Sequence, residues 1–314
     1  MTRAPILTIT LNPALDLSAR VSRMEAGPKL RLQDALREPG GGGVNVARVI
    51  HRLGGAVCAW VALGGATGAQ HRALLEAQGV PLRAFDLPVE TRQSWAVTED
   101  SGAQFRLQLP GDPWSEADAV RALEDIAQAA QGLVVLSGSQ PPGVSAEFPA
   151  MLAARLGPDR LIVDTSGPAL RQLINAAEVP LLALRLDQAE AEAQADKKLP
   201  DAQDTARFAQ ALRARGVAEV ICIARGADGN ILADASGCLH CCPPQVPVRS
   251  KIGAGDSFTG AFALALAQGR GAGDALREGT AAAAATVMSA GTALCAPDDM
   301  GALAAQCRMM PLDS

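Results

Sequence analysis

The stretch at residues 57–77 reads VCAWVALGGATGAQHRALLEA: a short apolar run, a glycine break and an alanine-rich segment of helical character. The same unit recurs along the chain, which predicts alternating strands and helices. Six apolar runs are strand candidates: residues 6–11, 57–63, 133–136, 161–163, 181–184 and 220–223. Because these runs are almost continuously hydrophobic, we expect strands that are buried on both faces, as in a parallel sheet. The pattern predicts an α/β fold with a doubly wound, mostly parallel sheet.

Two stretches interrupt this alternation. Residues 17–36 contain short alternating pieces around Gly27 and Pro28, and residues 93–109 contain two strand-like pieces, 94–98 and 105–109, around a turn at 100–102. Neither stretch offers a crossover helix, so we interpret both as antiparallel ribbons that form a small β-sheet lid. No linker divides the chain. We therefore expect one domain over residues 1–314, with lid strands inserted from about 17–36 and 93–109.

The composition excludes several classes of protein. The 314 residues are 48% hydrophobic, which is enough for a large core and argues against disorder. A net charge of −5 and an aromatic content of 3% without tyrosine argue against a nucleic-acid partner. The apolar run at 6–11 is too short for a signal peptide, and residues 279–297 are mostly small rather than strongly lipophilic, so no membrane segment is expected. Seven scattered cysteines are interpreted as reduced thiols. We expect a cytoplasmic protein with a small-molecule ligand.

The strongest local signal is SKIGAGDSFTG at residues 250–260, which runs into an alanine-rich helix. Gly253 and Gly255 would let a ligand approach the backbone at a helix N-terminus, where free N–H groups and the helix dipole stabilise an anion such as phosphate. A carboxylate among these donors could accept a proton from an attacking hydroxyl, which makes Asp256 a candidate base. The structural alternative is a helix cap, because Asp is a favoured N-cap residue. The motif alone does not separate the two interpretations.

Two further candidates lie near the N-terminus. The run EPGGGGVNVAR at residues 38–48 places four glycines before a helix, which costs chain entropy and indicates close approach of a ligand to bare backbone. It has neither the Walker sequence nor a dinucleotide-binding context, and a flexible loop is the alternative. Asp16 follows the first predicted strand. In doubly wound sheets ligands bind beyond the carboxyl ends of the strands, so Asp16 could accept hydrogen bonds from sugar hydroxyls; an exposed turn residue is the alternative.

These motifs together resemble those of the PfkB, or ribokinase-like, sugar kinases, and the resemblance covers essentially the whole chain. Four stretches match that family in order: TITLNPALD at 8–16, GGGGVNVAR at 40–48, SGSQPPG at 137–143 and GAGD at 253–256. Within the family, the phosphosugar kinases are most similar, especially the minor bacterial 6-phosphofructokinases, on the pieces KLR at 29–31, TRQ at 91–93 and CAPDD at 295–299. Many 1-phosphofructokinases instead have lysine within the glycine run, where this chain has Gly42.

The resemblance implies a ribokinase-like fold and transfer of a phosphoryl group from ATP, with Mg²⁺, to a phosphosugar hydroxyl. Asp256 would be the base, and the backbone of Gly253, Ala254 and Gly255 would hold the migrating anion. Asp16, Gly41 and Asn45 would hold sugar hydroxyls, and Gly42 is a further implied substrate contact. The implied contacts to the phosphate already on the substrate are Lys29, Arg92 and Ser139. We expect the 1-hydroxyl of fructose 6-phosphate as acceptor, with 1-phosphofructokinase or tagatose-6-phosphate kinase activity as the alternative and a non-catalytic sugar-phosphate-binding protein as the rival of another class. The resemblance also favours a homodimer that forms through the lid.

Two segments depart from the family pattern. Asp187 stands where the family usually has asparagine, three residues before the retained Glu190, which is the implied indirect magnesium contact. Ala224 stands where the family commonly has a hydroxyl residue, so one contact to ATP is lost. The following Arg225 is interpreted as a solvated loop charge, or alternatively as a cation for the nucleotide. The positions that the resemblance assigns to the nucleotide are Arg185, Asp187, Ala224, Gly226 and Gly229.

Other signals are interpreted as structural. The cysteines at 238, 241 and 242 with His240 invite a metal interpretation. A structural zinc site needs four well-placed ligands, however, and the sequence has no second paired cluster, so buried or edge-strand thiols are the favoured interpretation. His51 and His71 lie on predicted helices near arginines and are expected to be surface side chains. Trp60, Trp95 and Trp114 are isolated, so packing in the core or the lid is expected for each.

Overall fold

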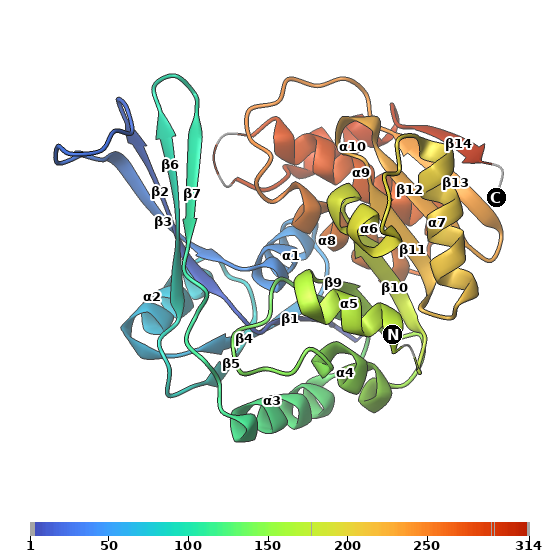
Figure 1. Ribbon diagram of the computed structural model, residues 1–314, viewed down its shortest axis with the longest axis horizontal. Helices are drawn as coiled ribbons and strands as arrows, with labels where there is room; N and C mark the ends of the chain where they lie inside the picture. The colour runs from blue at the N-terminus through green and yellow to red at the C-terminus, as the bar shows by residue number, and fades with distance from the viewer. Residues whose placement is uncertain (1–3, 177, 290, 292, 313–314) are drawn as a thin grey trace.

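The computed structural model describes residues 4–176, 178–289, 291 and 293–312. Two sheets organise these residues (Figure 1). The large sheet has ten strands in the order β14-β13-β12-β11-β10-β9-β8-β1-β4-β5. Its strands are β1 (Ile6–Thr10), β4 (Val57–Leu63), β5 (Leu82–Asp86), β8 (Val134–Ser137), β9 (Leu161–Asp164), β10 (Leu181–Leu186), β11 (Ala218–Ala224), β12 (Asn230–Asp234), β13 (Gly237–Cys242) and β14 (Arg308–Leu312).

The strands from β11 to β5 pair in parallel, and β12, β13 and β14 extend the sheet by antiparallel pairing. The predicted mostly parallel sheet is therefore confirmed, and each of the six strand candidates corresponds to one of its parallel strands. Their side chains are almost wholly buried, as the continuous hydrophobic runs indicated. The edge strand β5 and the antiparallel strands were not among the six candidates.

Helices cover both faces of this sheet (Figure 1). The helices are α1 (Gly42–Arg52), α2 (Gly65–Ala77), α3 (Glu116–Ala129), α4 (Phe148–Leu156), α5 (Gly167–Asn175), α6 (Gln188–Ala195), α7 (Ala202–Ala214), α8 (Ala254–Ala267), α9 (Ala272–Val287) and α10 (Pro297–Ala304), with one 3₁₀ turn at Gly226–Asp228. Buried residues of α3, α4, α5, α6 and α7 form the core on one face, and those of α1, α2, α8 and α9 form the core on the other. None of the helices in the described ranges is both long and apolar enough for a membrane crossing.

The lid is a separate four-stranded sheet with the order β3-β2-β6-β7. It consists of β2 (Ala14–Val21), β3 (Gln33–Gly40), β6 (Arg92–Glu99) and β7 (Gln104–Gln108). The two predicted antiparallel ribbons are present, and a parallel seam joins them, from the pair Ala14 and Arg92 to the pair Val21 and Glu99. Because β3 leads directly into α1, the lid and the glycine run before α1 are held in one continuous segment. The lid stands beside the large sheet on the side of α1 and α2 (Figure 1).

The tryptophans pack as expected, and one histidine does not. Trp60 and Trp114 are buried and both stack with Phe85, with ring centroids 5.0 and 6.2 Å from it, and Trp95 lies half-buried on lid strand β6. His51 is exposed, but the prediction of a surface position for His71 is wrong.

His71 is buried because α2 packs against the end of β3, where the ring nitrogen Nε2 lies 3.0 Å from the carbonyl oxygen of Gly40. Burial lowers the pKa of His71 to about 4, so the ring is neutral and Nε2–H donates to that carbonyl.

The cysteine stretch forms strand β13, on which alternate residues face opposite sides of the sheet. Cys238 belongs to the core on one face and Cys241 to the core on the other. Within the described ranges, no three His, Cys, Asp or Glu side chains gather in a group that could hold a metal ion.

Candidate active site

The N-terminus of α8 has the geometry of an anion site. Its N-cap is Gly253, in the left-handed region at φ +76°, and no side chain caps the helix. The first intrahelical bond is donated by the Ser257 N–H to the Gly253 carbonyl, 2.9 Å away. Of the N–H groups between them, that of Ala254 donates a long bond of 3.5 Å to the Lys251 carbonyl, whereas those of Gly255 and Asp256 precede the hydrogen-bond ladder of the helix. This end of α8 can therefore donate backbone hydrogen bonds to a negatively charged group.

Asp256 lies in the first turn of α8 and is not its cap. Its Oδ2 accepts a hydrogen bond of 2.8 Å from Asn45 Nδ2, so the carboxylate is directed at α1 rather than at its own helix. Burial raises the pKa of Asp256 to about 7, the neighbouring Asp164 carboxylate adds to the rise, and the Asn45 hydrogen bond opposes it. A carboxyl group with a pKa near 7 exchanges its proton at neutral pH, which is what a general base requires.

A buried ion pair supports the loop beneath this site. Arg185, on β10, places Nη1 3.2 Å from Asp164 Oδ1, and Thr259, on α8, donates to Asp164 Oδ2 at 2.8 Å. These contacts tie α8 to the carboxyl ends of β9 and β10. A Cβ atom at Gly255 would lie only 3.0 Å from Arg185 Nη1, so the absent side chain lets the guanidinium lie under the open helix end.

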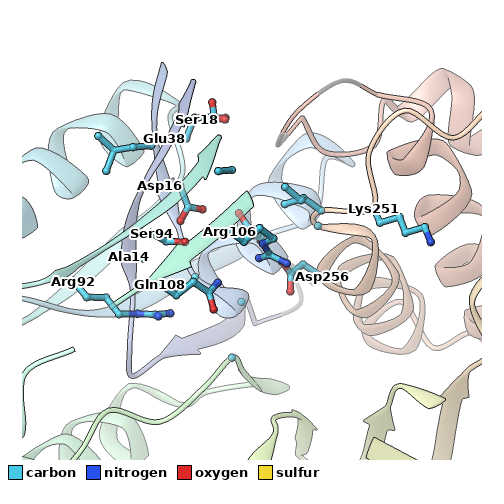
Figure 2. A pocket seen from close by; sticks show the side chains of 18 residues that line it. Ala14, Asp16, Ser18, Glu38, Arg92, Ser94, Arg106, Gln108, Lys251 and Asp256 are labelled. Atoms are coloured by element: carbon cyan, nitrogen blue, oxygen red, sulfur yellow. Dashed lines mark hydrogen bonds between the residues drawn. The ribbon is translucent and has the colours of Figure 1, made fainter. Parts of the chain in front are cut away.

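A polar cavity of about 280 Å³, here called the lid cavity, opens between the lid and the start of α8. Figure 2 shows that side chains from the lid strands face Asp256 across it. Seven of the predicted site residues line the lid cavity: Asp16, Gly41, Gly42, Asn45, Arg92, Gly253 and Asp256. Residues that are more than 200 positions apart in sequence, such as Asn45 and Asp256, meet here, because β2, β3, β6 and α1 surround the start of α8.

The glycine run is required first by the packing of the protein itself. A Cβ atom at Gly42 would lie 2.5 Å from Ser137 Oγ, one at Gly41 would lie 2.7 Å from Thr10 Cγ2, and one at Gly43 would overlap the Ile9 carbonyl. Gly41 also has φ +119°, which other residues rarely adopt. The alternative of a flexible loop is therefore wrong, since the run is packed between β1 and β8 and also lines the lid cavity.

Two predicted site residues of opposite charge, Asp16 and Arg92, lie on neighbouring lid strands of this cavity. Burial raises the pKa of Asp16 to about 6, although the Arg92 cation lowers it. Arg92 is fixed by donating to the Asn12 and Leu109 carbonyls at 3.3 and 3.0 Å. The cavity thus offers a hydroxyl-binding carboxylate and a cation from neighbouring strands.

Sequence reasoning missed several residues of the lid cavity. Glu38, Ser94, Arg106, Gln108 and Lys251 also line it. Strand β7 reads QFRLQ, so its polar and apolar residues alternate, and the polar ones on one face include Arg106 and Gln108. That alternation was the available signal, because a lid with one polar face must turn that face toward solvent or ligand.

Two predicted phosphate contacts lie outside the lid cavity. Ser139 lines a neighbouring cavity of about 530 Å³, which shares Arg92 and Gln108 with the lid cavity. Lys29 is exposed in the loop between β2 and β3 and lines neither cavity. Its contact with the substrate phosphate stays a prediction.

A larger, mostly apolar cavity of about 770 Å³ lies on the other side of the α8 N-terminus. It brings together five of the predicted residues, namely Arg185, Ala224, Gly226, Ala254 and Gly255, with small apolar side chains of 243–248 and α9. Gly229 does not line it; its φ of +99° and its closeness to the Cys241 carbonyl give it a role in the turn before β12. Lys251 lines both cavities, which therefore meet at the motif of residues 250–260.

Arg225 is buried, with 6% of its surface exposed. Its Nη1 donates to the Leu199 carbonyl at 2.9 Å and to Thr205 Oγ1 at 2.6 Å, and Nη2 donates to the Pro200 carbonyl at 3.0 Å. The interpretation as a solvated charge is wrong, and its guanidinium is committed to the loop before α7 rather than to the apolar cavity.

Asp187 and Glu190 form a capping box at the start of α6. Asp187 Oδ1 accepts from the Glu190 N–H, and Glu190 Oε2 accepts from the Asp187 N–H, both at 2.8 Å. Asp187 is exposed and lines neither the lid cavity nor the apolar cavity. Glu190 is half-buried, and burial raises its pKa to about 7. The carboxylate that replaces asparagine therefore serves the helix that it precedes.

Comparisons with known proteins agree with this arrangement. A family model described as pfkB family carbohydrate kinase matches residues 1–299. The chain is 36% identical to the ATP-dependent 6-phosphofructokinase isozyme 2 of Escherichia coli (strain K12), over 94% of this chain and 96% of that protein. It is 32% identical to the 1-phosphofructokinase of the same strain, over 98% of this chain and 99% of that protein. The crystal structure of phosphofructokinase-2 from Escherichia coli in complex with fructose-6-phosphate matches with a TM-score of 0.88 at 33% identity and covers 98% of this chain and 99% of that chain.

Proposed function

Because this chain belongs to the pfkB family of carbohydrate kinases, we propose that it is an ATP-dependent 6-phosphofructokinase that phosphorylates the 1-hydroxyl of fructose 6-phosphate. One observation carries the proposal. Asp256 lies at an uncapped helix N-terminus between a polar cavity under the lid and a larger apolar cavity. That arrangement suits the transfer of an anionic group from a nucleotide on one side to a hydroxyl on the other.

The lid cavity suits a sugar phosphate. Asp16 and Asn45 offer an acceptor and a donor for sugar hydroxyls, and Arg92 and Arg106 offer cations that offset the charge of a phosphate. Because Arg92 also lines the cavity that contains Ser139, a phosphate at this boundary would be within reach of both. The acceptor hydroxyl would then point toward Asp256.

The apolar cavity suits the adenosine part of ATP. Its small apolar walls lead to the N–H groups of Ala254 and Gly255, which would hold the γ-phosphate oxygens together with Gly253. In the transfer step, Asp256 takes the proton of the acceptor hydroxyl, the hydroxyl oxygen bonds to the γ-phosphorus, and the bond to ADP breaks. Positioning and charge stabilisation supply most of the catalysis in such a reaction.

The residues present fit a magnesium ion that arrives with the nucleotide. Mg²⁺ is commonly held by one or two carboxylates with substrate phosphates and water, not by a cage of protein ligands. Glu190 commits Oε2 to the capping box and lines neither cavity, but it lies near Asp164 and near Arg185, which lines the apolar cavity. We propose that Glu190 holds the ion indirectly. The ion would neutralise charge on the transferred phosphoryl group.

A coupled assay that detects ADP tests the substrate. Fructose 6-phosphate, fructose 1-phosphate and tagatose 6-phosphate are compared at equal concentration with MgATP. We expect the highest kcat/KM for fructose 6-phosphate; a clear preference for fructose 1-phosphate or tagatose 6-phosphate would assign one of the alternative activities. Calorimetry tests the other alternative, a non-catalytic sugar-phosphate-binding protein. Such a protein would bind the sugar phosphate but would show neither MgATP binding nor turnover.

The same proposal includes a homodimer formed through the lid. The lid exposes several large apolar side chains, among them Leu36 (62%), Leu107 (55%), Leu109 (55%) and Phe105 (39%). Leu36, on β3, pairs with Ser18 and lies on the cavity face. On β7, Phe105 and Leu107 alternate with the polar residues that face the lid cavity, so these two lie on the opposite face. A second copy of the lid would cover this face. Sedimentation velocity at micromolar concentration should give twice the monomer mass, and a monomer would contradict the dimer.

A further inference from the structure

A continuous line of contacts runs from the lid to Asp256. On lid strand β3, Glu38 places Oε1 3.0 Å from Arg48 Nη2. On helix α1, Arg48 Nη1 donates to Asn45 Oδ1 at 3.1 Å, and Asn45 Nδ2 donates to Asp256 Oδ2 at 2.8 Å. Glu38 and Asp256 thus lie on opposite sides of the lid cavity and are connected through α1 (Figure 2).

The chemistry of the side chains fixes the direction of each bond in this line. A guanidinium group has only donors, so Arg48 must contact the oxygen of the Asn45 amide. An ionised carboxylate has only acceptors, so Asp256 must contact the amide nitrogen. If the Asn45 amide were rotated by half a turn, both contacts would be lost and replaced by repulsive ones. Arg48 therefore decides which end of the amide faces the base.

Arg48 is itself held firmly. It is 3% exposed, and its Nε donates to Gln78 Oε1 at 2.8 Å, in addition to its contacts with Glu38 and Asn45. Asn45 and Arg48 are three residues apart, which places them on the same face of α1. The planar guanidinium group of Arg48 holds its donors in a fixed arrangement, so it can orient the Asn45 amide better than a lysine ammonium could.

We propose that Arg48 is a positioning residue for the reaction: it holds the Asn45 amide with its nitrogen toward Asp256, and Glu38 on the lid holds Arg48 in turn. This inference rests on the proposed function. The position of the lid strand β3 is thereby coupled to the orientation of the base, because Glu38 is part of β3 and lines the same cavity as Asp256. Without Arg48, the amide can rotate and the carboxylate loses its donor.

The test is a double-mutant cycle of Arg48→Met and Asn45→Ala, read from the pH profile of kcat/KM. Losing the amide donor removes about 1 kcal/mol of stabilisation from the ionised carboxylate. Each single variant should therefore shift the acidic limb of the kcat/KM profile to higher pH, by on the order of one pH unit. In the Asn45→Ala background, Arg48→Met should move the limb no further, since the amide through which it acts is absent. Additive shifts would overturn the proposal.

Two further variants separate positioning from charge and from folding. Arg48→Lys keeps the charge but loses the fork; a shift like that of Arg48→Met supports positioning, and a normal profile overturns it. If Arg48→Met does not fold, the cycle is run with Arg48→Lys.

The matched control is Arg160→Met. Arg160 lies just before β9 and donates to the Ala130 and Gly132 carbonyls just before β8, at the end of the sheet away from the site. The Arg160→Met variant should have a lower melting temperature than the parent protein but the same acidic limb in its kcat/KM profile. Absence of turnover in the parent protein would instead contradict the proposed function.

Discussion

The helices α6 and α8 begin in contrasting ways. At α6, Asp187 has an extended backbone, with φ −86° and ψ 173°, and its carboxylate accepts the hydrogen bond of the N–H three residues on. At α8, Gly253 is left-handed, with φ 76° and ψ 0°, and has no side chain to offer. Asp256, three residues later, accepts from Asn45 instead. The first helix end is closed by its own residues, and the second is left open.

This difference shows what turns a common structural feature into a site. Both segments place an aspartate beside a helix N-terminus, and in both the dipole favours the negative charge. A capped end has already used its donors. An end that begins with glycine keeps them for a ligand, and a carboxylate that is held by another helix remains available to that ligand.

The largest expected effect is that of Asp256→Asn. The substitution keeps the shape of the side chain and removes the base, so kcat should fall by at least ~10²-fold. Binding of MgATP, measured by calorimetry, should remain, because the α8 N–H groups are unchanged. If Asp256→Asn retained most of the activity, Asp256 would not be the base. The functional contrast between the N-termini of α6 and α8 would then not hold.

The pH dependence of catalysis is the next largest effect. Because the pKa of Asp256 is raised to about 7, the base is protonated below that pH. In the free enzyme, kcat/KM should rise by about tenfold per pH unit below 7 and level off above it. Profiles from pH 5 to 9 test this, and an acidic limb near pH 4 would show that the carboxyl is not desolvated as the structure indicates.

The same shift has a consequence for stability, with the opposite sign. Between the ordinary pKa of 3.8 and about 7, the folded protein holds a proton on Asp256 that the unfolded chain has lost. Stability from this group is therefore present at low pH and declines as pH rises through that window. Asp16, with a pKa of about 6, adds a contribution of the same sign. Urea unfolding of Asp256→Asn should show a weaker decline than the parent.

The smallest expected effect is that of Asp187→Ala. Loss of an N-cap side chain costs about 1 kcal/mol in the free energy of unfolding, whereas the cost in turnover should be far below that of Asp256→Asn. Asp187→Asn retains a capping oxygen and should restore most of the stability. If Asp187→Ala instead raised the KM for ATP strongly without loss of stability, the N-termini of both α6 and α8 would serve the nucleotide. The contrast between the two helix ends would then be wrong.

The sequence was sufficient for prediction where the burial or the role of a residue depends on its neighbours along the chain. Continuous apolar runs identified the parallel strands, because both faces of such strands are buried. The aspartates at 16 and 256 were found because each lies in a short motif with its own chemistry, whereas Asn45 and Arg92 were implied only by the family resemblance; the structure brings all four to the lid cavity. The parallel seam between β2 and β6 was not predictable, since it joins residues about 80 positions apart that carry no shared local pattern.

The failures concern side chains whose partners come from elsewhere in the chain. Arg225 follows a strand in a glycine-rich turn, which is typical of an exposed loop, but the carbonyls that bury it belong to residues 199 and 200. His71 lies on a helix among polar residues, and only the approach of β3 buries it. Asp187 was compared with a family pattern at one position, whereas its capping role depends on the glutamate three residues later.

The placement of the tryptophans gives this protein a built-in optical probe. With no tyrosine in the chain, ultraviolet emission comes almost entirely from three indoles. Two of them are buried in the core of the large sheet and stack with Phe85, outside the lid strands. Of the three, Trp95 alone lies on the lid, on strand β6, which borders the lid cavity through its neighbours Ser94 and Ala96. A change in emission on adding a sugar phosphate would therefore report chiefly on the lid, with no label attached.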